Sequence, residues 1–303
     1  MKRDLTKILD LTSDECAYLL ERAAFMKRMR QARGEYVPLR GKSLAMIFEK
    51  ASTRTRVSFE LGMKELGGNA LHLSAAETQI GRGETIGDTG RVLSRYVNAI
   101  MIRTYAQKTV EELAHWSSVP VINGLSDLYH PCQILADLFT TWELKGDLRG
   151  LKIAYIGDGN NVANSWIEAA ILLGLNLAVA FPDQYRPAPA LERLARKNGN
   201  ILFTNDPADA ADNADAINTD VWVSMGMEKE RDERIGAFAG FSVDEKLLKH
   251  AKKDVVVMHC LPAHKNEEIS ESVFERFQEV IFTQAENRLH AQKALLEWLM
   301  VEV

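Results

Sequence analysis

The feature that most constrains the fold is a regular alternation of short β-rich runs with longer amphipathic stretches. Ten runs are predicted to be strands: 43–48, 69–73, 98–103, 119–122, 151–156, 176–181, 200–204, 215–219, 254–259 and 280–283. The stretches between them that are predicted to be helices include 55–66, 84–96, 109–117, 162–173 and 243–251. Strands that alternate with helices in this way are typical of parallel sheets covered by helices. The sequence therefore predicts an α/β fold.

The length of the chain favours two domains. At 303 residues it exceeds the size at which a single hydrophobic core stops growing. The stretch 131–145 is predicted to be a helix that joins the halves, and the break 146–150 follows it. We therefore expect two α/β domains, each with a mainly parallel sheet flanked by helices.

Helices are also predicted at both ends of the chain. The first runs from Leu11 to Gln31, where Thr12 and Glu15 have the spacing of a capping box. Thr109 and Glu112 have the same spacing, which predicts a second capping box within 109–117. A closing helix is predicted at 288–300.

Composition excludes several classes of protein. The net charge of −5 and the pI of 5.9 argue against a nucleic acid or an anionic membrane as the main partner. No apolar run approaches the ~18 residues of a spanning helix, and the N-terminus lacks the apolar region of a signal peptide. Three widely spaced cysteines, an odd number, favour free thiols in a reducing compartment. We expect a cytoplasmic protein.

Residues 52–56, Ser-Thr-Arg-Thr-Arg, fall at the turn from the first predicted strand into a helix. The first N–H groups of a helix lack intrahelical partners and lie at its positive end, so such a turn binds anions. Three hydroxyl groups and two guanidinium groups add donors suited to a phosphate dianion. The structural alternative is a Ser/Thr N-cap followed by solvated arginines.

Ligands of open α/β sheets bind beyond the carboxyl ends of the strands, and polar residues are numerous there. They are Arg103, His130, Gln133, Asn160, Asn161, Asp220, Ser224, Cys260 and, after the last predicted strand, Arg288. Each taken alone has a structural reading: a histidine before a helix-starting proline, a turn-capping aspartate, a small buried cysteine.

The sequence gives weaker support for a dinucleotide site and for a metal site. Gly157-Asp158-Gly159-Asn160-Asn161 resembles the start of a dinucleotide fingerprint, but the third glycine is absent. A metal site is disfavoured because His259 and Cys260 are adjacent on a predicted strand and should face opposite ways, and because no CxxC or HExxH spacing occurs.

Four segments together resemble the aspartate/ornithine transcarbamylase family over the whole chain. They read STRTR at 52–56, HPCQ at 130–133, DVWVSMG at 220–226 and HCLP at 259–262. The last two, and the absence of a lysine from the loop 75–85, resemble the ornithine-specific branch rather than the aspartate-specific one. The resemblance implies a carbamoyl phosphate domain at 1–147, completed by the helix 288–303, and an amino-acid domain at 148–287. It also implies that the terminal helices pack together on the first domain.

The resemblance assigns carbamoyl phosphate to a defined set of residues. Ser52, Thr53, Arg54 and Thr55 would hold the phosphate, and Arg103 and His130 would lie near the carbonyl and bridging oxygens. Gln133, Arg288 and the Leu261 carbonyl would fix the carbamoyl NH₂, close to Cys260. Gln79 would reach the phosphate site of a neighbouring subunit, which implies a homotrimer with shared active sites.

For ornithine, Asn161 and the Met225 backbone would bind the carboxylate, and Asp220 and Ser224 the α-ammonium group. If the δ-amine has a lysine-like pKa of about 10.4, neutralising it at pH 7 costs about 4–5 kcal/mol. Cys260 would orient that nitrogen or accept its proton, and we expect nearby Arg and His residues to favour the thiolate. The reaction needs no metal and no organic cofactor.

The sequence therefore predicts a carbamoyltransferase that forms citrulline and phosphate, as in arginine biosynthesis. Three alternatives remain: a relative that acts on putrescine or another amino acid, a catalytically silent ligand-binding relative, and a dinucleotide oxidoreductase.

Overall fold

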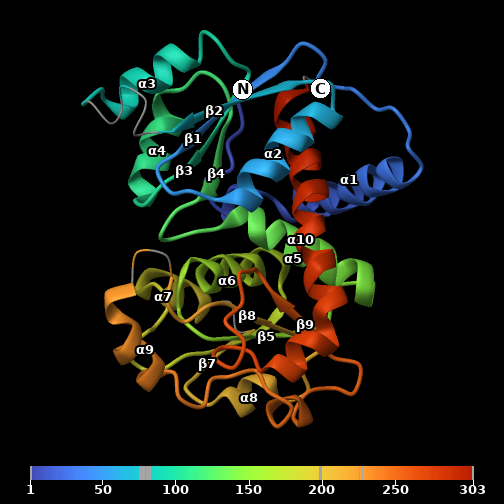
Figure 1. Ribbon diagram of the computed structural model, residues 1–303, viewed down its shortest axis with the longest axis vertical. Coiled ribbons are helices and arrows are strands. Elements are labelled where there is room, and N and C mark those ends of the chain that lie inside the picture. The colour runs from blue at the N-terminus through green and yellow to red at the C-terminus, as the bar shows by residue number, and fades with distance from the viewer. Residues whose placement is uncertain are drawn as a thin grey trace. The chain divides into compact units, whose positions relative to one another are not determined.

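The computed structural model describes residues 2–74, 79, 83–197, 200–224, 226 and 228–301 (Figure 1). The chain divides into two compact units. Unit 1 contains residues 1–139 and 286–303, and unit 2 contains residues 140–285. Each unit is built around its own parallel sheet. Among the described residues, no helix is long and apolar enough to cross a membrane.

The sheet of unit 1 has four parallel strands in the order β2-β1-β3-β4. Their bounds are β1 Ser43–Phe48, β2 Asn69–Ser74, β3 Ala99–Arg103 and β4 Val121–Leu125. β3 is buried throughout and β1 nearly so, as expected for central strands that helices cover on both faces. β2 lies at an edge of this sheet and is largely exposed.

The helical elements of unit 1 are η1 Ile8–Asp10, α1 Ser13–Gln31, α2 Thr53–Glu65, α3 Ile86–Leu93 and α4 Gln107–Trp116. The first part of α5 Pro131–Lys145 and the second part of α10 Glu271–Met300 complete it. The predicted capping box of Thr12 and Glu15 is confirmed, since the side chain of each accepts a hydrogen bond from the backbone N–H of the other. Arg22 of α1 donates to Glu297 of α10 at 2.8 Å, so the terminal helices are packed together as expected.

The sheet of unit 2 has five parallel strands in the order β7-β6-β5-β8-β9. They are β5 Lys152–Ile156, β6 Asn176–Ala180, β7 Ile201–Thr204, β8 Ala216–Thr219 and β9 Val256–His259. The helices are α6 Asn161–Leu173, α7 Pro189–Ala195, α8 Pro207–Ala211 and α9 Arg231–Ala237, with short η4 Glu228–Glu230 and η5 Leu247–Lys249.

Three local predictions are wrong. Residues 280–283 are not a strand but part of the 30-residue helix α10, because the buried residues Val273, Phe277 and Ile281 recur every four positions. α4 begins after Ala106, which makes no side-chain cap, so Thr109 and Glu112 do not form the predicted capping box. The predicted helix 243–251 is reduced to the single turn η5.

Strand order places the functional residues. In unit 1 the chain moves from β1 outward to β2 and then returns to the other side of β1 with β3. In unit 2, β6 and β7 lie on one side of β5, and β8 and β9 on the other. Such reversals leave a crevice at the carboxyl ends of the two strands concerned. Ser52 follows β1 and Arg103 ends β3 in unit 1, and Asn161 and Asp220 follow β5 and β8 in unit 2. Two other expected residues follow the next strands outward, His130 after β4 and Cys260 after β9.

Candidate functional site

The phosphate-side residues of unit 1 begin at the N-terminus of α2. Ser52 is the N-cap, and its Oγ accepts from the Thr55 N–H at 3.3 Å. Thr53 and Arg54 are exposed in the first turn. The second guanidinium group of the motif is used elsewhere, because Arg56 pairs with Glu60 one turn along the helix at 2.9 Å. Arg54 lies within the first turn of the helix, where the anion is expected.

Arg288 joins this turn to α5. Its Nη1 donates to Gln133 Oε1 at 2.6 Å, and its Nη2 donates to Thr55 Oγ1 at 3.3 Å. Gln133 in turn donates to Asp137 at 2.8 Å. The amide of Gln292 is assigned with its oxygen toward Arg288, since only that orientation satisfies both of its ends. Residues distant in sequence, three of them predicted, therefore form one hydrogen-bonded group.

Arg103 ends β3 and is nine-tenths buried. Its carbonyl accepts from the Glu49 N–H at 2.9 Å, and the register with β4 shifts between Ile102 and Arg103. Lys50, which sequence reasoning did not identify, is also buried; it pairs with Asp127 and lies 4.2 Å from the centroid of the Tyr105 ring. Its position two residues before Ser52, the first residue of the Ser-Thr-Arg motif, is the sequence signal that could identify it.

His130 is held at the start of α5 by a polar loop. Ser126 donates to Gln107 at 2.7 Å, and its Oγ accepts from the Tyr129 N–H at 3.1 Å. Burial, followed by the charges of Arg288, Arg103 and Arg54, lowers the pKa of His130 well below 6.5. The imidazole is therefore neutral at pH 7. It can donate one hydrogen bond without adding a positive charge of its own.

The electrostatics of this group suit an anion. Three guanidinium groups act on one neutral imidazole, at the positive end of a helix. Burial raises the pKa of the neighbouring Cys132 to about 12, and its thiol donates to the Asn123 carbonyl, so this cysteine stays protonated at pH 7.

In unit 2 the polar group is centred on Asp220, which directly follows β8 and is buried. Its Oδ1 accepts from the Cys260 thiol and from the Val221 N–H, both at 2.8 Å. Its Oδ2 accepts from the Asn160 amide at 2.8 Å. The sulfur therefore holds its proton in this arrangement. The described partner of Cys260 within unit 2 is the Asp220 carboxylate.

Asn160 is the N-cap of α6 and a second residue that sequence reasoning did not assign. Its Oδ1 accepts from the N–H groups of Val162 and Ala163 and from the Tyr155 hydroxyl at 3.1 Å. Burial, and then the charges of Asp220, Asp158 and Cys260, raise the pKa of Tyr155 well above 10, so the hydroxyl stays protonated. Both ends of the Asn160 amide are thereby fixed.

A buried ion pair lies beside this group. Arg234 donates through Nη1 to Asp158 and to the Trp222 carbonyl, each at 2.9 Å. Burial raises the pKa of Asp158 to about 6, against the opposing effect of Arg234. The pair connects the loop after β5 to the segment after β8. That segment continues to Ser224, which is half-buried.

The glycine-rich loop has a packing explanation. A Cβ at Gly159 would lie 2.3 Å from the backbone of Arg186 and Pro187. Gly159 also donates its N–H to the Tyr185 carbonyl at 2.9 Å. This glycine is therefore required by the close approach of another segment of the chain, with no pyrophosphate needed to explain it.

The geometric argument against a metal site is wrong, although the residues do not present a set of available ligands. Atoms of Asp220, His259 and Cys260 lie within 4.8 Å of one another. Both ring nitrogens of His259 are used, however: Nδ1 accepts from the Leu261 N–H at 2.9 Å, and Nε2 lies 3.0 Å from Glu268. Cys260 already donates to Asp220.

Four further residues were predicted to belong to the site. Asn161 is the first residue of α6 and is half-buried. Gln79 is exposed, and its carbonyl accepts from the Glu84 N–H at 3.0 Å. Leu261 is half-buried and has a φ of 59°. Met225 lies outside the described residues.

Comparisons with known proteins cover the whole fold. The family profile "Aspartate/ornithine carbamoyltransferase, carbamoyl-P binding domain" matches residues 3–143, and "Aspartate/ornithine carbamoyltransferase, Asp/Orn binding domain" matches residues 149–299. The chain is 54% identical to the ornithine carbamoyltransferase of Anoxybacillus flavithermus, over 98% of this chain and 96% of the relative. It is 53% identical to that of Methanoculleus marisnigri, with the same coverage. The solved ornithine carbamoyltransferase of Pyrococcus furiosus is similar, with a TM-score of 0.95 and 50% identity over 100% of this chain and 98% of that one.

Proposed function

Because the chain belongs to the aspartate/ornithine carbamoyltransferase family, we propose that it transfers the carbamoyl group of carbamoyl phosphate to the δ-amine of L-ornithine. The products are L-citrulline and phosphate. The observation that carries the phosphate half of this proposal is the group of Arg54, Arg103 and Arg288 around a neutral His130.

Carbamoyl phosphate binds to unit 1 in this scheme. Ser52, Thr53, Arg54 and Thr55 hold the phosphate at the N-terminus of α2, where the first N–H groups and the dipole favour a dianion. Gln133 is already oriented by Arg288 and Asp137, so it can accept from the carbamoyl NH₂ without reorganisation. Leu261 and Cys260 complete the contacts to the carbamoyl group.

The chemical step places negative charge on the carbonyl oxygen when the amine attacks. Arg103 and His130 stabilise that oxygen, the arginine by charge and the neutral imidazole as a hydrogen-bond donor. Donors held in place before the reaction stabilise a developing oxyanion more than mobile water does, because they need no reorientation. Phosphate then leaves with its charge neutralised by the arginines that bound it.

Ornithine binds to unit 2. Asp220 pairs with the α-ammonium group, assisted by Ser224, and Asn161 and the Met225 backbone bind the carboxylate. Cys260 receives the δ-nitrogen, which must be neutral to attack. In the structure the thiol donates to Asp220. When the α-ammonium group of ornithine pairs with Asp220 instead, the sulfur is free to accept a hydrogen bond from the δ-amine.

The wider biology rests on the same resemblance. The carbamoyl phosphate domain spans 1–147 with 288–303, and the ornithine domain spans 148–287. The active protein is a cytoplasmic homotrimer that serves arginine biosynthesis, with Gln79 of one subunit completing the phosphate site of the next.

A steady-state assay with carbamoyl phosphate tests the substrate. Ornithine, putrescine, lysine, N-acetylornithine and aspartate are compared as acceptors, and citrulline and phosphate are measured. We expect ornithine to have the highest kcat/KM by a wide margin, since Asp220 selects an α-ammonium group that putrescine and N-acetylornithine lack. Preference for putrescine would overturn the proposal in favour of a paralogous activity. Absence of turnover with every amine would favour a silent relative, and thermal stabilisation by NAD would favour an oxidoreductase.

A further inference from the structure

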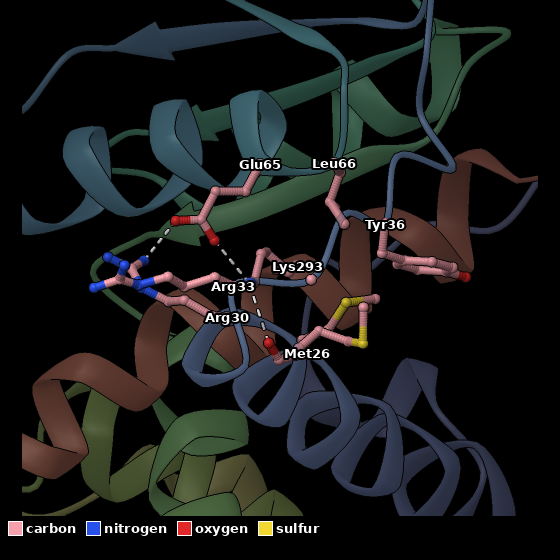
Figure 2. Close-up of a pocket in the computed structure, with 9 residues that line it drawn as sticks. Met26, Arg30, Arg33, Tyr36, Glu65, Leu66 and Lys293 are labelled. Carbon is pink, nitrogen blue, oxygen red and sulfur yellow. Dashed lines mark hydrogen bonds and ion pairs between the residues drawn. The ribbon is translucent and has the colours of Figure 1, made fainter.

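A cavity of about 210 Å³ lies in unit 1, and none of the residues assigned to the reaction lines it. Side chains from α1, from the segment after it, from the end of α2 and from α10 line it (Figure 2). At ~30 Å³ per water molecule the volume corresponds to roughly seven waters. That space suits a small metabolite rather than a nucleotide.

The cavity carries positive charge. Arg30, Arg33 and Lys293 line it together with one carboxylate, Glu65, which gives a formal charge of +2. Glu65 is used on both sides, because Arg30 donates to its Oε1 at 2.6 Å and Lys293 donates to its Oε2 at 2.8 Å. Lys293 is almost fully buried. Within the described part of the chain, Arg33 forms no ion pair, so its charge is the one available to a ligand.

The backbone of Arg33 provides an independent observation. Its φ is 53°, in the left-handed region, where it ends α1 with its N–H bonded to the Arg30 carbonyl at 3.1 Å. Glycine is the favoured residue at such a position, and a side chain there is strained. The glycine stands one residue later, at Gly34. An arginine held in an unfavourable conformation at the edge of a cavity is consistent with a role for its side chain.

The opposite side of the cavity is apolar. Met26, Met29 and Leu66 form it, and the hydroxyl of the nearby Tyr36 is already engaged by Glu297. Cationic groups on one side and thioether and aliphatic groups on the other match an amphipathic anion. A guanidinium group binds a carboxylate in a two-pronged geometry, and methionine adapts to irregular aliphatic shapes.

We propose that this cavity binds a small aliphatic carboxylic acid. Its carboxylate pairs with Arg33, and its hydrocarbon chain packs against Met26 and Met29. This site is distinct from the phosphate-side group and does not depend on the proposed reaction.

Methyl-labelled methionine NMR of the full chain tests the proposal. The probe is 4-methylpentanoate, which lacks an amine and therefore cannot mimic ornithine; 4-methylpentanamide is its neutral control. We expect saturable shifts of the Met26 and Met29 methyl signals, among the ten methionines, with the acid but not with the amide. No saturable shift, which would indicate a cavity filled by water alone, or equal shifts with both compounds, would overturn the proposal.

Substitutions separate binding from folding. Arg33→Gly removes the guanidinium group and relieves the left-handed backbone, so probe affinity should fall at least tenfold while the thermal midpoint stays the same or rises. Arg33→Asn, which tolerates the same backbone, should also lose affinity. Arg28→Ala removes an exposed arginine of α1 that does not line the cavity, and Arg54→Ala alters the phosphate side; both should bind the probe normally. Full affinity in folded Arg33→Gly, or loss in Arg54→Ala, would contradict the assignment.

Discussion

At the scale of single residues, the main finding is that Asp220 and Cys260 are directly hydrogen-bonded to each other. The carboxylate accepts from the thiol, from the Asn160 amide and from the Val221 N–H, all at 2.8 Å. Sequence reasoning gave the aspartate and the cysteine separate tasks. Their direct contact means that neither task can be changed without affecting the other.

A double-mutant cycle should reveal this coupling. Asp220→Asn should raise ornithine KM, and Cys260→Ala should lower kcat and change the acid limb of its pH profile. Because the side chains are in contact, the combined loss in kcat/KM should differ from the sum of the single losses by about 0.5–3 kcal/mol. Steady-state kinetics of the four proteins measure it. Additive losses would contradict a functional link, and normal turnover with an unchanged profile in Cys260→Ala would remove the cysteine from catalysis.

Asn160 should act as a positioning residue for Asp220. Asn160→Ser keeps a side chain that can cap α6 but loses the amide that holds Asp220, so ornithine KM should rise several-fold. Carbamoyl phosphate KM should stay unchanged. Tyr155→Phe, which removes only the bond to Asn160, should cause a smaller change of the same kind. Equal increases in both KM values would indicate general destabilisation instead.

His130 should make stability depend on pH. Its folded-state pKa lies well below 6.5, so the unfolded chain binds the extra proton first as the pH falls. The free energy of unfolding contributed by this residue is therefore present above pH 6.5 and is lost below it, toward the folded-state pKa. His290, with a pKa lowered to about 4 mainly by burial, acts in the same direction. The test is denaturant unfolding of the wild type and His130→Gln between pH 7 and 5; parallel curves would contradict the prediction.

At the scale of elements, the N-terminus of α2 gives different environments to Arg54 and Arg56, two arginines that look equivalent in the sequence. Ser52 caps the helix, Arg54 lies in the first turn, and Arg56 is tied to Glu60. The helical period sets this difference, because a residue pairs readily with the one four positions later. The predicted phosphate site therefore depends on one guanidinium group of the motif together with Arg103 and Arg288.

Arg54→Ala and Arg56→Ala form a matched pair on this helix. Arg54→Ala should weaken carbamoyl phosphate binding by about 1.5–3 kcal/mol, the usual worth of a hydrogen bond to a charged group. Arg56→Ala removes only an exposed ion pair worth about 0.3–0.5 kcal/mol of stability and should bind normally. Calorimetric affinity and thermal midpoints check both proteins. Near-normal affinity in folded Arg54→Ala would remove this residue from the phosphate site.

α10 shows how an element can mislead when it is read locally. The tetrapeptide Val280 to Thr283 consists of residues that favour strands, and its composition alone predicts a strand. In the structure it lies within a long helix, where the buried residues Val273, Phe277 and Ile281 recur every four positions. The same helix carries Arg288 to Thr55 and Gln133. The helical period of the buried residues around this tetrapeptide outweighs the β preference of its four side chains.

At the scale of the whole molecule, each unit has a parallel sheet with one reversal of strand order. In each unit that reversal collects polar loops at one edge. Carbamoyl phosphate chemistry in unit 1 and amine recognition in unit 2 use the same architectural device. The two polar groups differ in charge. Arginines are prominent around His130 in unit 1, and the carboxylates Asp158 and Asp220 are prominent in unit 2.

Shared sites are a prediction about the assembled protein. If Gln79 completes the pocket of a neighbouring subunit, Gln79→Ala and Arg54→Ala proteins, each impaired, should regain part of their activity after subunit exchange. In mixed trimers some pockets then contain neither substitution. Activity is measured before and after exchange, with mass-verified mixed oligomers. An exchanged mixture as inactive as its parents, or a fully active monomer, would indicate self-contained sites.

The sequence by itself determined the fold class, nearly every strand, and the positions of the residues that structure then brought together. It could do so because hydrophobic periodicity and chain punctuation are local properties, and because parallel strands direct their carboxyl ends to one edge. Tertiary structure decided what those local signals do not contain. The Cys260 thiol is bonded to Asp220, and Gly159 is required by the close approach of the Arg186 and Pro187 backbone. The buried roles of Lys50 and Asn160 also depend on partners 77 and 60 residues away. Such long-range pairs arise only when burial makes an unpaired polar group costly, so they belong to the packed molecule rather than to any segment of the sequence.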